Sequence, residues 1–264
     1  MLKTTTFKKG SVTFSDTGKG RVVVLLHGFL GSHHIWENTI SELSKSYRVI
    51  AIDLPGHGTT DCFGYVHTME LLAKCVKAVM DSLRLKKYVI IGHSMGGYVG
   101  LALADLYPDN LKGLCLFHSS AYADSEEKIQ IRTKAIEFVK ENGVASFLKT
   151  TIPGLFSENF REQHKEVIDQ LITASSKFSK GAIIQYYQAM IARPERTKIF
   201  TFFRNPILFI IGERDNAIPL DQSLKQCHQP FISDLHLLPE VAHMGMLEDE
   251  MNCNNIIQAF LGRD

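Results

Sequence analysis

Five short apolar runs constrain the fold of this chain most. They read VVVLLH at residues 22–27, YRVIAID at 47–53, KYVIIG at 87–92, LKGLCLFH at 111–118 and PILFIIG at 206–212. Apolar residues that follow one another without alternation are typical of strands buried on both faces, as in a parallel sheet. Every run is also far shorter than the roughly 20 apolar residues that a membrane-spanning helix needs.

Helical periodicity fills most of the intervals between these runs. It covers residues 34–43, 68–83, 94–107 and 248–261. Strands that alternate with helices in this way predict an α/β fold, with a mostly parallel, twisted sheet of about eight strands flanked by helices. Two further strands, near residues 4–7 and 11–16, are separated by Lys8-Lys9-Gly10 and are predicted to form a hairpin at the sheet edge.

One long interval, residues 122–200, contains helical periodicity and no buried-strand run. Its first helix is predicted to begin after Ser125, a typical N-cap residue, and to end at Asn142-Gly143. We predict that this segment is an inserted helical cap, and that residues 1–121 and 201–264 form the α/β core. Its apolar residues predict a modest hydrophobic substrate; they are Phe138, Phe147, Leu148, Phe156, Phe160, Tyr186, Tyr187 and Met190.

The stretch GHSMGG, residues 92–97, lies between a predicted strand and a predicted helix. It contains the pattern G-x-S-x-G, in which a strained turn exposes a serine hydroxyl as a nucleophile. Gly92 and Gly96 suit that turn because side chains there would collide across it. A phosphate-binding loop is the alternative, but Ser94 breaks the dinucleotide fingerprint and no Walker sequence is present. Ser94 is therefore the predicted nucleophile.

A serine nucleophile needs a base and an acid that orients the base. Asp215 follows the apolar run at 206–212, which places it at the carboxyl end of a predicted strand. His243 lies in a short loop between a predicted strand at 234–238 and the last helix. The order serine, aspartate, histidine is the one that such an α/β fold uses. Asp53 follows another strand, but it comes too early in the chain for this order.

An oxyanion hole completes this chemistry. The sequence LLHGFLGS follows the first buried strand, and we predict that the backbone N–H of Phe29 acts together with that of Met95. His27 is predicted to hold this loop by hydrogen bonds. His33-His34 could suggest a metal, but no third ligand has suitable spacing, so neither a metal nor a cofactor is expected.

Charge and cysteine content narrow the class of partner. The chain of 264 residues has 29 Lys and Arg against 28 Asp and Glu, a formal net charge of +1. Because these charges are spread along the chain, neither nucleic acid nor an anionic membrane is expected as a partner. Five irregularly spaced cysteines and the absence of an apolar N-terminal core predict a reducing, cytoplasmic location. We expect a small-molecule substrate and a monomer or homodimer.

The chain resembles the cap-bearing branch of the α/β-hydrolase superfamily. Five segments carry the resemblance, in the order and spacing of that family: HGF at 27–29, DLPGHG at 53–58, GHSMGG at 92–97, GERDNAIP at 212–219 and AHMGMLE at 242–248. The resemblance covers residues 22–261 and implies a serine hydrolase of the carboxylesterase type that acts on an ester or related acyl compound without a cofactor. Serine at position 94 is unlike the aspartate of epoxide hydrolases and haloalkane dehalogenases.

Within the superfamily several activities stay open. The segments HGFLGSHHIWE and DLPGHG resemble the lyase of the menaquinone pathway, but His93 and Tyr98 replace the tyrosine and arginine of its elbow. C–C bond hydrolases, cofactor-free perhydrolases, enol-lactonases and hormone receptors share the scaffold. His93, Trp36 and Tyr98 are the candidate substrate-binding residues. Arg132 and Arg193 could anchor an anionic substrate, but a surface position is expected for both.

Overall fold

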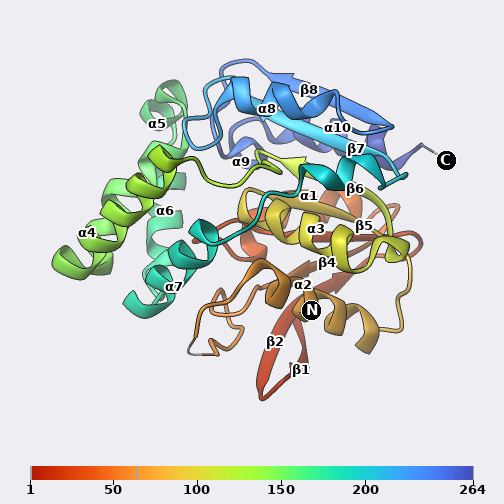
Figure 1. The fold of residues 1–264 in the computed structure, drawn as a ribbon, viewed down its shortest axis with the longest axis horizontal. Helices are drawn as coiled ribbons and strands as arrows, with labels where there is room; N and C mark the ends of the chain where they lie inside the picture. Colours follow the sequence, from red (N-terminus) through yellow and green to blue (C-terminus); the bar gives the residue numbers. More distant parts are fainter. Residues whose placement is uncertain (1, 64, 264) are drawn as a thin grey trace.

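The computed structural model describes residues 2–63 and 65–263, and within these ranges eight strands form one sheet (Figure 1). Their spatial order is β1-β2-β4-β3-β5-β6-β7-β8. The strands are β1 Leu2–Phe7, β2 Gly10–Thr17, β3 Val22–Leu26, β4 Arg48–Ile52, β5 Tyr88–His93, β6 Leu111–Phe117, β7 Ile207–Gly212 and β8 Ser233–Leu238. The predicted sheet of about eight strands is thus confirmed.

Strands β3 to β8 are parallel, and only the pairs β1–β2 and β2–β4 are antiparallel. The predicted hairpin is present, with β1 at the edge and β2 paired on its other side with β4. Residues of β5 and β7 are buried throughout their length, as the continuous apolar runs required. In β8, by contrast, more exposed and less exposed residues alternate, because β8 is the other edge of the sheet and exposes one face.

Helices cover both faces of the sheet. α2 and α3 pack side by side on one face, and α1 contacts α10 on the other (Figure 1). Short 3-10 turns at His33–Trp36, Pro108–Asn110, Pro153–Leu155 and Thr197–Thr201 join longer elements. The helices outside residues 122–200 are α1 Glu37–Leu43, α2 Met69–Ser82, α3 Met95–Leu106, α8 Leu220–Cys227, α9 Gly245–Glu248 and α10 Glu250–Leu261.

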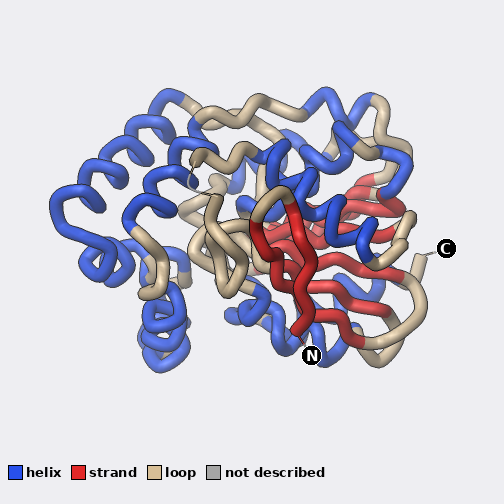
Figure 2. Tube along the Cα trace, turned by 90° about the horizontal axis from the view of Figure 1, so that it is seen from below, coloured by secondary structure: helices blue, strands red, loops and turns tan. Residues whose placement is uncertain are grey.

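Residues 122–200 hold only helices within the described chain: α4 Glu126–Thr151, α5 Glu158–Gln163, α6 Lys165–Ser175 and α7 Lys180–Ile191. They lie together on one side of the sheet (Figures 1 and 2). Ser125 caps α4 by accepting a hydrogen bond from the N–H of Lys128, as predicted. The backbone leaves the helical conformation at Gly143, with φ 79° and ψ 173°, where the helix end was predicted, and then resumes it.

Three contacts tie this helical segment to loops of the core. Ser175 Oγ donates to the carbonyl oxygen of Leu30 at 2.9 Å, and Tyr186 Oη donates to that of Pro55. The N–H of His243 donates to the carbonyl oxygen of Leu155 at 3.0 Å. The segment therefore lies over the carboxyl ends of the strands, where a cap is expected, although the domain boundaries themselves stay a prediction.

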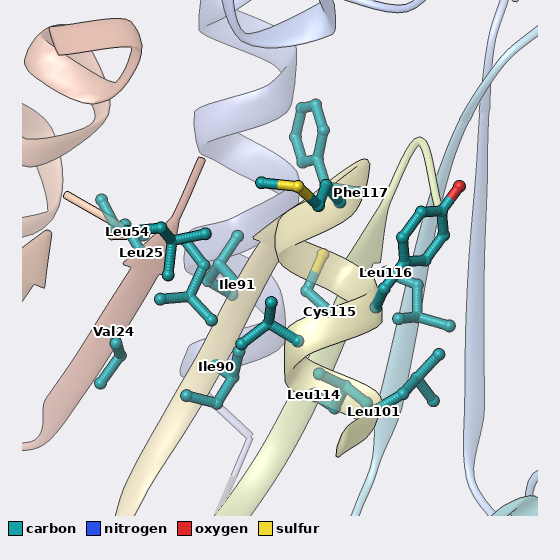
Figure 3. Close-up of a cluster of buried hydrophobic side chains, with 14 of the residues drawn as sticks. Val24, Leu25, Leu54, Ile90, Ile91, Leu101, Leu114, Cys115, Leu116 and Phe117 are labelled. Atoms are coloured by element: carbon teal, nitrogen blue, oxygen red, sulfur yellow. The ribbon is translucent and has the colours of Figure 1, made fainter. Parts of the chain in front are cut away.

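Side chains of β3, β5, β6 and α3 form the central core (Figure 3). Ile90, Ile91, Leu101 and Leu114 are at most 1% exposed. Burying such a side chain stabilises the fold by about 1.5–3 kcal/mol relative to leaving it in water. This packing fixes the position of the end of β5 relative to the start of α3.

We expect Gly92→Ala to destabilise the protein, because a Cβ at position 92 would lie 2.5 Å from the carbonyl oxygen of Gly96 and 2.6 Å from the N–H nitrogen of Gly97. Backbone atoms cannot move aside cheaply, so the free energy of unfolding should fall by about 1–3 kcal/mol in urea titrations. Gly154→Ala is the matched control, since a Cβ there meets no atom within 4 Å. Equal unfolding midpoints for the two variants would contradict this account of the turn.

Candidate active site

The candidate site lies where the strand order reverses. From β3 the chain passes to β4 on one side, and from β5 it passes to β6 on the other. Loops separate at such a point, which leaves a crevice beyond the carboxyl ends of the strands. Leu26 of β3 pairs with Gly92 of β5, so residues 27–29 and 93–95 leave the sheet side by side. The structure therefore brings Phe29, Ser94 and Met95 together, as the sequence predicted.

Ser94 has a strained backbone, with φ 49° and ψ −115°. Such a conformation costs a non-glycine residue on the order of 1–3 kcal/mol. Four hydrogen bonds hold it in place. Its N–H donates to the carbonyl oxygen of Phe117 at 2.9 Å, and its own carbonyl oxygen accepts from the N–H groups of Gly97 at 2.9 Å and Tyr98 at 3.4 Å and from Ser119 Oγ at 2.8 Å. The turn leaves the Ser94 side chain half-buried at the wall of a cavity.

Asp215 and His243 form a buried pair on the same side of the sheet. His243 Nδ1 donates to Asp215 Oδ2 at 2.8 Å, which leaves Nε2 free to accept a proton. The other carboxylate oxygen accepts from the N–H groups of Ala217 at 2.7 Å and Ile218 at 2.9 Å. Burial alone would raise the pKa of Asp215, but the charge and hydrogen bond of His243, with His118 beside it, hold that pKa below its usual range.

Two further histidines surround this pair. His93 Nε2 donates to the carbonyl oxygen of His243 at 2.8 Å, so His93 fixes the backbone of the residue it faces. His118 Nδ1 accepts from the N–H of Gly212 at 3.0 Å and lies 3.5 Å from Asp215 Oδ2. Burial lowers the pKa of both imidazoles, which favours their neutral forms.

Sequence reasoning assigned no role to His118 or Glu248. His118 ends the apolar run of β6, so the rule that functional residues follow strands could have found it. Glu248 accepts hydrogen bonds from the N–H groups of Ala242, Met244 and Ser157 at 2.9–3.2 Å. It thereby fixes the loop that carries His243. No local signal distinguishes Glu248 from the acidic residues that follow it in the sequence.

Phe29 and Met95 are the residues predicted to form the oxyanion hole; Met95 adjoins Ser94 in the chain, and Phe29 lines the same cavity as Ser94. Met95 is the first residue of α3, and the N–H groups of a first helical turn have no intrahelical acceptor. Gly28 lets the two loops approach, since a Cβ there would lie 2.7 Å from His93 Nδ1 and 3.1 Å from Ser94 Cβ. His27 holds the loop as predicted: its Nε2 accepts from Leu54 N–H at 3.0 Å and its Nδ1 donates to Gly28 at 2.7 Å.

A cavity of about 180 Å³ opens onto these groups. Core residues on its wall include Phe29, His93, Ser94, Tyr98 and His243. The helical segment supplies most of the remaining wall, through Lys128, Ile131, Arg132, Thr151, Ile152, Leu155, Leu171, Tyr187 and Met190. Most of these are apolar, but of the eight apolar residues named from the sequence only Tyr187 and Met190 line this cavity.

Trp36 does not line this cavity. It is fully buried and packs edge-on against His93, with ring centroids 6.4 Å apart, and against Phe117 at 5.7 Å. The structure therefore places Trp36 beneath the site as a support for His93. His33 and Asp53 also lie outside the cavity wall, where Asp53 accepts from the His33 N–H at 2.7 Å and pairs with its Nδ1 at 2.9 Å.

The expectation that Arg132 and Arg193 lie on the surface is wrong. Their relative exposures are 8% and 7%. Asp124 makes this burial possible, because its carboxylate accepts from Arg132 Nε at 2.7 Å and from Arg193 Nη1 at 2.7 Å. The Arg193 guanidinium also lies 4.0 Å over the ring of Tyr98. Tyr98 thus has one face on the cavity side and one face against a cation.

Solved structures of hydrolases share this fold. A thermophilic esterase from Thermogutta terrifontis, in its malate-bound form, is 30% identical with a TM-score of 0.90, over 96% of this chain and 93% of that one. The enol-lactonase from Burkholderia xenovorans LB400 is 21% identical with a TM-score of 0.89, over 96% and 97% of the two chains. The second likeness shows the fold alone.

Curated relatives carry hydrolase names. The 2-hydroxy-6-oxononadienedioate/2-hydroxy-6-oxononatrienedioate hydrolase of Paraburkholderia phymatum is 24% identical over 278 residues, which span 96% of this chain and 91% of that protein. 3-Oxoadipate enol-lactonase 2 of Acinetobacter baylyi is 24% identical over 92% of this chain and 90% of its own. In the part of the chain that the structure describes, no helix is long and apolar enough to span a membrane.

The family model for the alpha/beta hydrolase fold matches residues 21–250, almost the whole chain. The match includes all the segments that form the crevice, from the loop after β3 to the His243 loop. Sequence motifs, strand order and relatives therefore agree, and the chain belongs to the α/β-hydrolase family.

Proposed function

We propose that this protein is a serine hydrolase that cleaves a carboxylic ester or a related acyl compound. The observation that carries the proposal is the buried Asp215–His243 pair, which shares one cavity with the strained Ser94. An imidazole with its Nδ1–H held by a carboxylate presents Nε2 as a general base. The names of the relatives, which include an esterase and enol-lactonases, support hydrolysis as the reaction class.

In the first half-reaction, Ser94 Oγ attacks the substrate carbonyl carbon while His243 Nε2 accepts the hydroxyl proton. Catalysis requires these two atoms to come within about 2.6–3.2 Å in the substrate complex. The carbonyl oxygen gains negative charge and accepts hydrogen bonds from the N–H groups of Phe29 and Met95. Each such donor contributes about 2.7–4 kcal/mol to the stability of the transition state.

The tetrahedral intermediate collapses as His243 returns the proton to the leaving oxygen, which yields an alcohol and an acyl-Ser94. A water molecule then attacks the acyl carbon and gives a proton to the same nitrogen. Asp215 stabilises the imidazolium in both steps, because its carboxylate stays charged at neutral pH. His93 and Glu248 position His243 without contacting the reacting atoms.

A C–C bond hydrolase is the alternative that a specific observation favours, since the dienedioate hydrolase relative is named for that substrate class. Activity on a panel of simple 4-nitrophenyl esters separates the two, because an esterase turns these over and loses the activity with Ser94. The helical segment 122–200 is proposed as the cap that shapes the substrate pocket. Cytoplasmic location and a monomeric or homodimeric state remain predictions from the sequence.

We expect Ser94→Ala to abolish both ester turnover and covalent labelling by a fluorophosphonate probe, since no other side chain would be activated by His243. Gel fluorescence after labelling measures this directly. Ser41→Ala is the matched control, because Ser41 is exposed on α1 and far along the chain from the site. Full labelling of Ser94→Ala would disprove the assignment of the nucleophile.

We expect Asp215→Asn to lower kcat on short esters by roughly 10³–10⁴-fold, because an amide would favour the wrong tautomer of His243. Stopped-flow or steady-state hydrolysis of a 4-nitrophenyl ester measures the loss. Asp221→Asn should retain activity, since Asp221 is exposed in the first turn of α8 and pairs only with Lys225. If Asp215→Asn keeps more than about a tenth of the activity, another group orients His243.

A further inference from the structure

The cavity has an excess of positive charge at the end formed by α4. Lys128 and Arg132 both line it, one helical turn apart. Arg193 lies behind them, and Asp124 is the carboxylate that pairs with Arg132 and Arg193. Asp215 is the second carboxylate that attracts Lys128, so three cations lie near two anions. The acidic residues of the first turn of α4, Glu126 and Glu127, are exposed and do not line the cavity.

Among these three cations, Lys128 is the one that forms no ion pair within the described residues. Its Nζ donates to the carbonyl oxygen of Ala217 at 2.8 Å, and within residues 2–63 and 65–263 no carboxylate lies within 4 Å of it. An ammonium group has three donors, so two remain for a ligand. Burial, together with repulsion from Arg132, lowers the pKa of Lys128, while attraction by Asp124 and Asp215 opposes this shift. Lys128 is half-buried and makes no ion pair in the part of the chain that the structure describes, so a ligand carboxylate would gain a charge-assisted hydrogen bond there.

Lys128 lies on the same side of the cavity as the proposed catalytic pair. Ala217 belongs to the turn whose N–H groups hold Asp215, so Lys128 lies on the Asp215–His243 side of the cavity. Much of the remaining wall of the cavity is apolar and includes Ile152, Leu155 and Met190. A ligand that fits this pattern has an apolar body and one anionic end.

We infer that the substrate is an ester or related acyl compound with a carboxylate group remote from the bond that is cleaved, and that Lys128 binds this carboxylate with Arg132 adding to the local positive potential. The inference rests on the proposed function, because it assigns Ser94 to the other end of the same substrate. Lys128 is thus a specificity-determining residue, and Asp124 serves to bury the arginines beside it.

Kinetics with matched ester pairs test this inference. One pair places the charge on the acyl half, 4-nitrophenyl hydrogen glutarate against 4-nitrophenyl pentanoate. The other places it on the alcohol half, 4-carboxyphenyl butanoate against phenyl butanoate. In the wild type, the ratio of kcat/KM for the charged over the neutral ester should exceed that of Lys128→Met by about 10- to 100-fold in at least one pair, as the loss of a charge-assisted hydrogen bond implies.

Three controls make the result specific. Lys128→Arg should keep most of the preference because it keeps the charge. Lys134→Met, which removes an exposed cation from the same helix, should leave both ratios unchanged. Unfolding midpoints show whether each variant is folded. Ratios for Lys128→Met that stay within about twofold of the wild type in both pairs would overturn the inference while the proposed hydrolase function stands.

A binding measurement separates this inference from the proposed chemistry. Calorimetric titration of the Ser94→Ala variant with monomethyl glutarate and with dimethyl glutarate compares a charged and a neutral ligand without turnover. We expect tighter binding of monomethyl glutarate, and loss of that difference when Lys128→Met is added. If no ester is hydrolysed but this difference is found, the proposed function fails and the anion site stands. Equal affinities for the two ligands would refute the anion site.

Discussion

The buried carboxylate of Asp215 is the interaction on which the rest of the site depends. A charged group removed from water is unfavourable unless donors surround it, and Asp215 obtains them from His243 and from the N–H groups of Ala217 and Ile218. These donors come from the loops after β7 and β8, so the carboxylate fixes both loops at once. His93 and Glu248 then hold the His243 loop from its other sides. The imidazole is left with one orientation, toward the cavity.

Most of the fold and the order of the site follow from the sequence because they depend on local patterns. Continuous apolar runs are typical of strands inside a parallel sheet, and the residues at the carboxyl ends of such strands meet at one edge. That argument gives Ser94, Asp215, the loop of Phe29 and, applied to every run, also His118. Gly143 breaks its helix where predicted because a positive φ is a local property of glycine.

The sequence could not give the features that depend on which distant residues pack together. Arg132 and Arg193 have the sequence signature of surface residues, and their burial depends on Asp124, which lies in a loop before α4. Trp36 was a candidate for contact with a ligand, and only the packing of its ring against His93 of β5 and Phe117 of β6 places it in the core. Glu248 is one of several acidic residues in a row, and its role arises from the turn of the chain at Ala242.

The difference between local patterns and tertiary contacts also separates the residues proposed for the reaction from those proposed for substrate specificity. Strand ends are placed by a rigid sheet, so the proposed catalytic residues are positioned by the parts of the sequence that are easiest to interpret. The cap segment, by contrast, packs through helices whose faces are set by tertiary contacts. Tyr98 connects the core and the helical segment: it lies on α3 of the core, and its ring contacts the guanidinium of Arg193 in the helical segment. The charges beside this pocket therefore depend on tertiary contacts such as the pairing of Asp124 with Arg132 and Arg193.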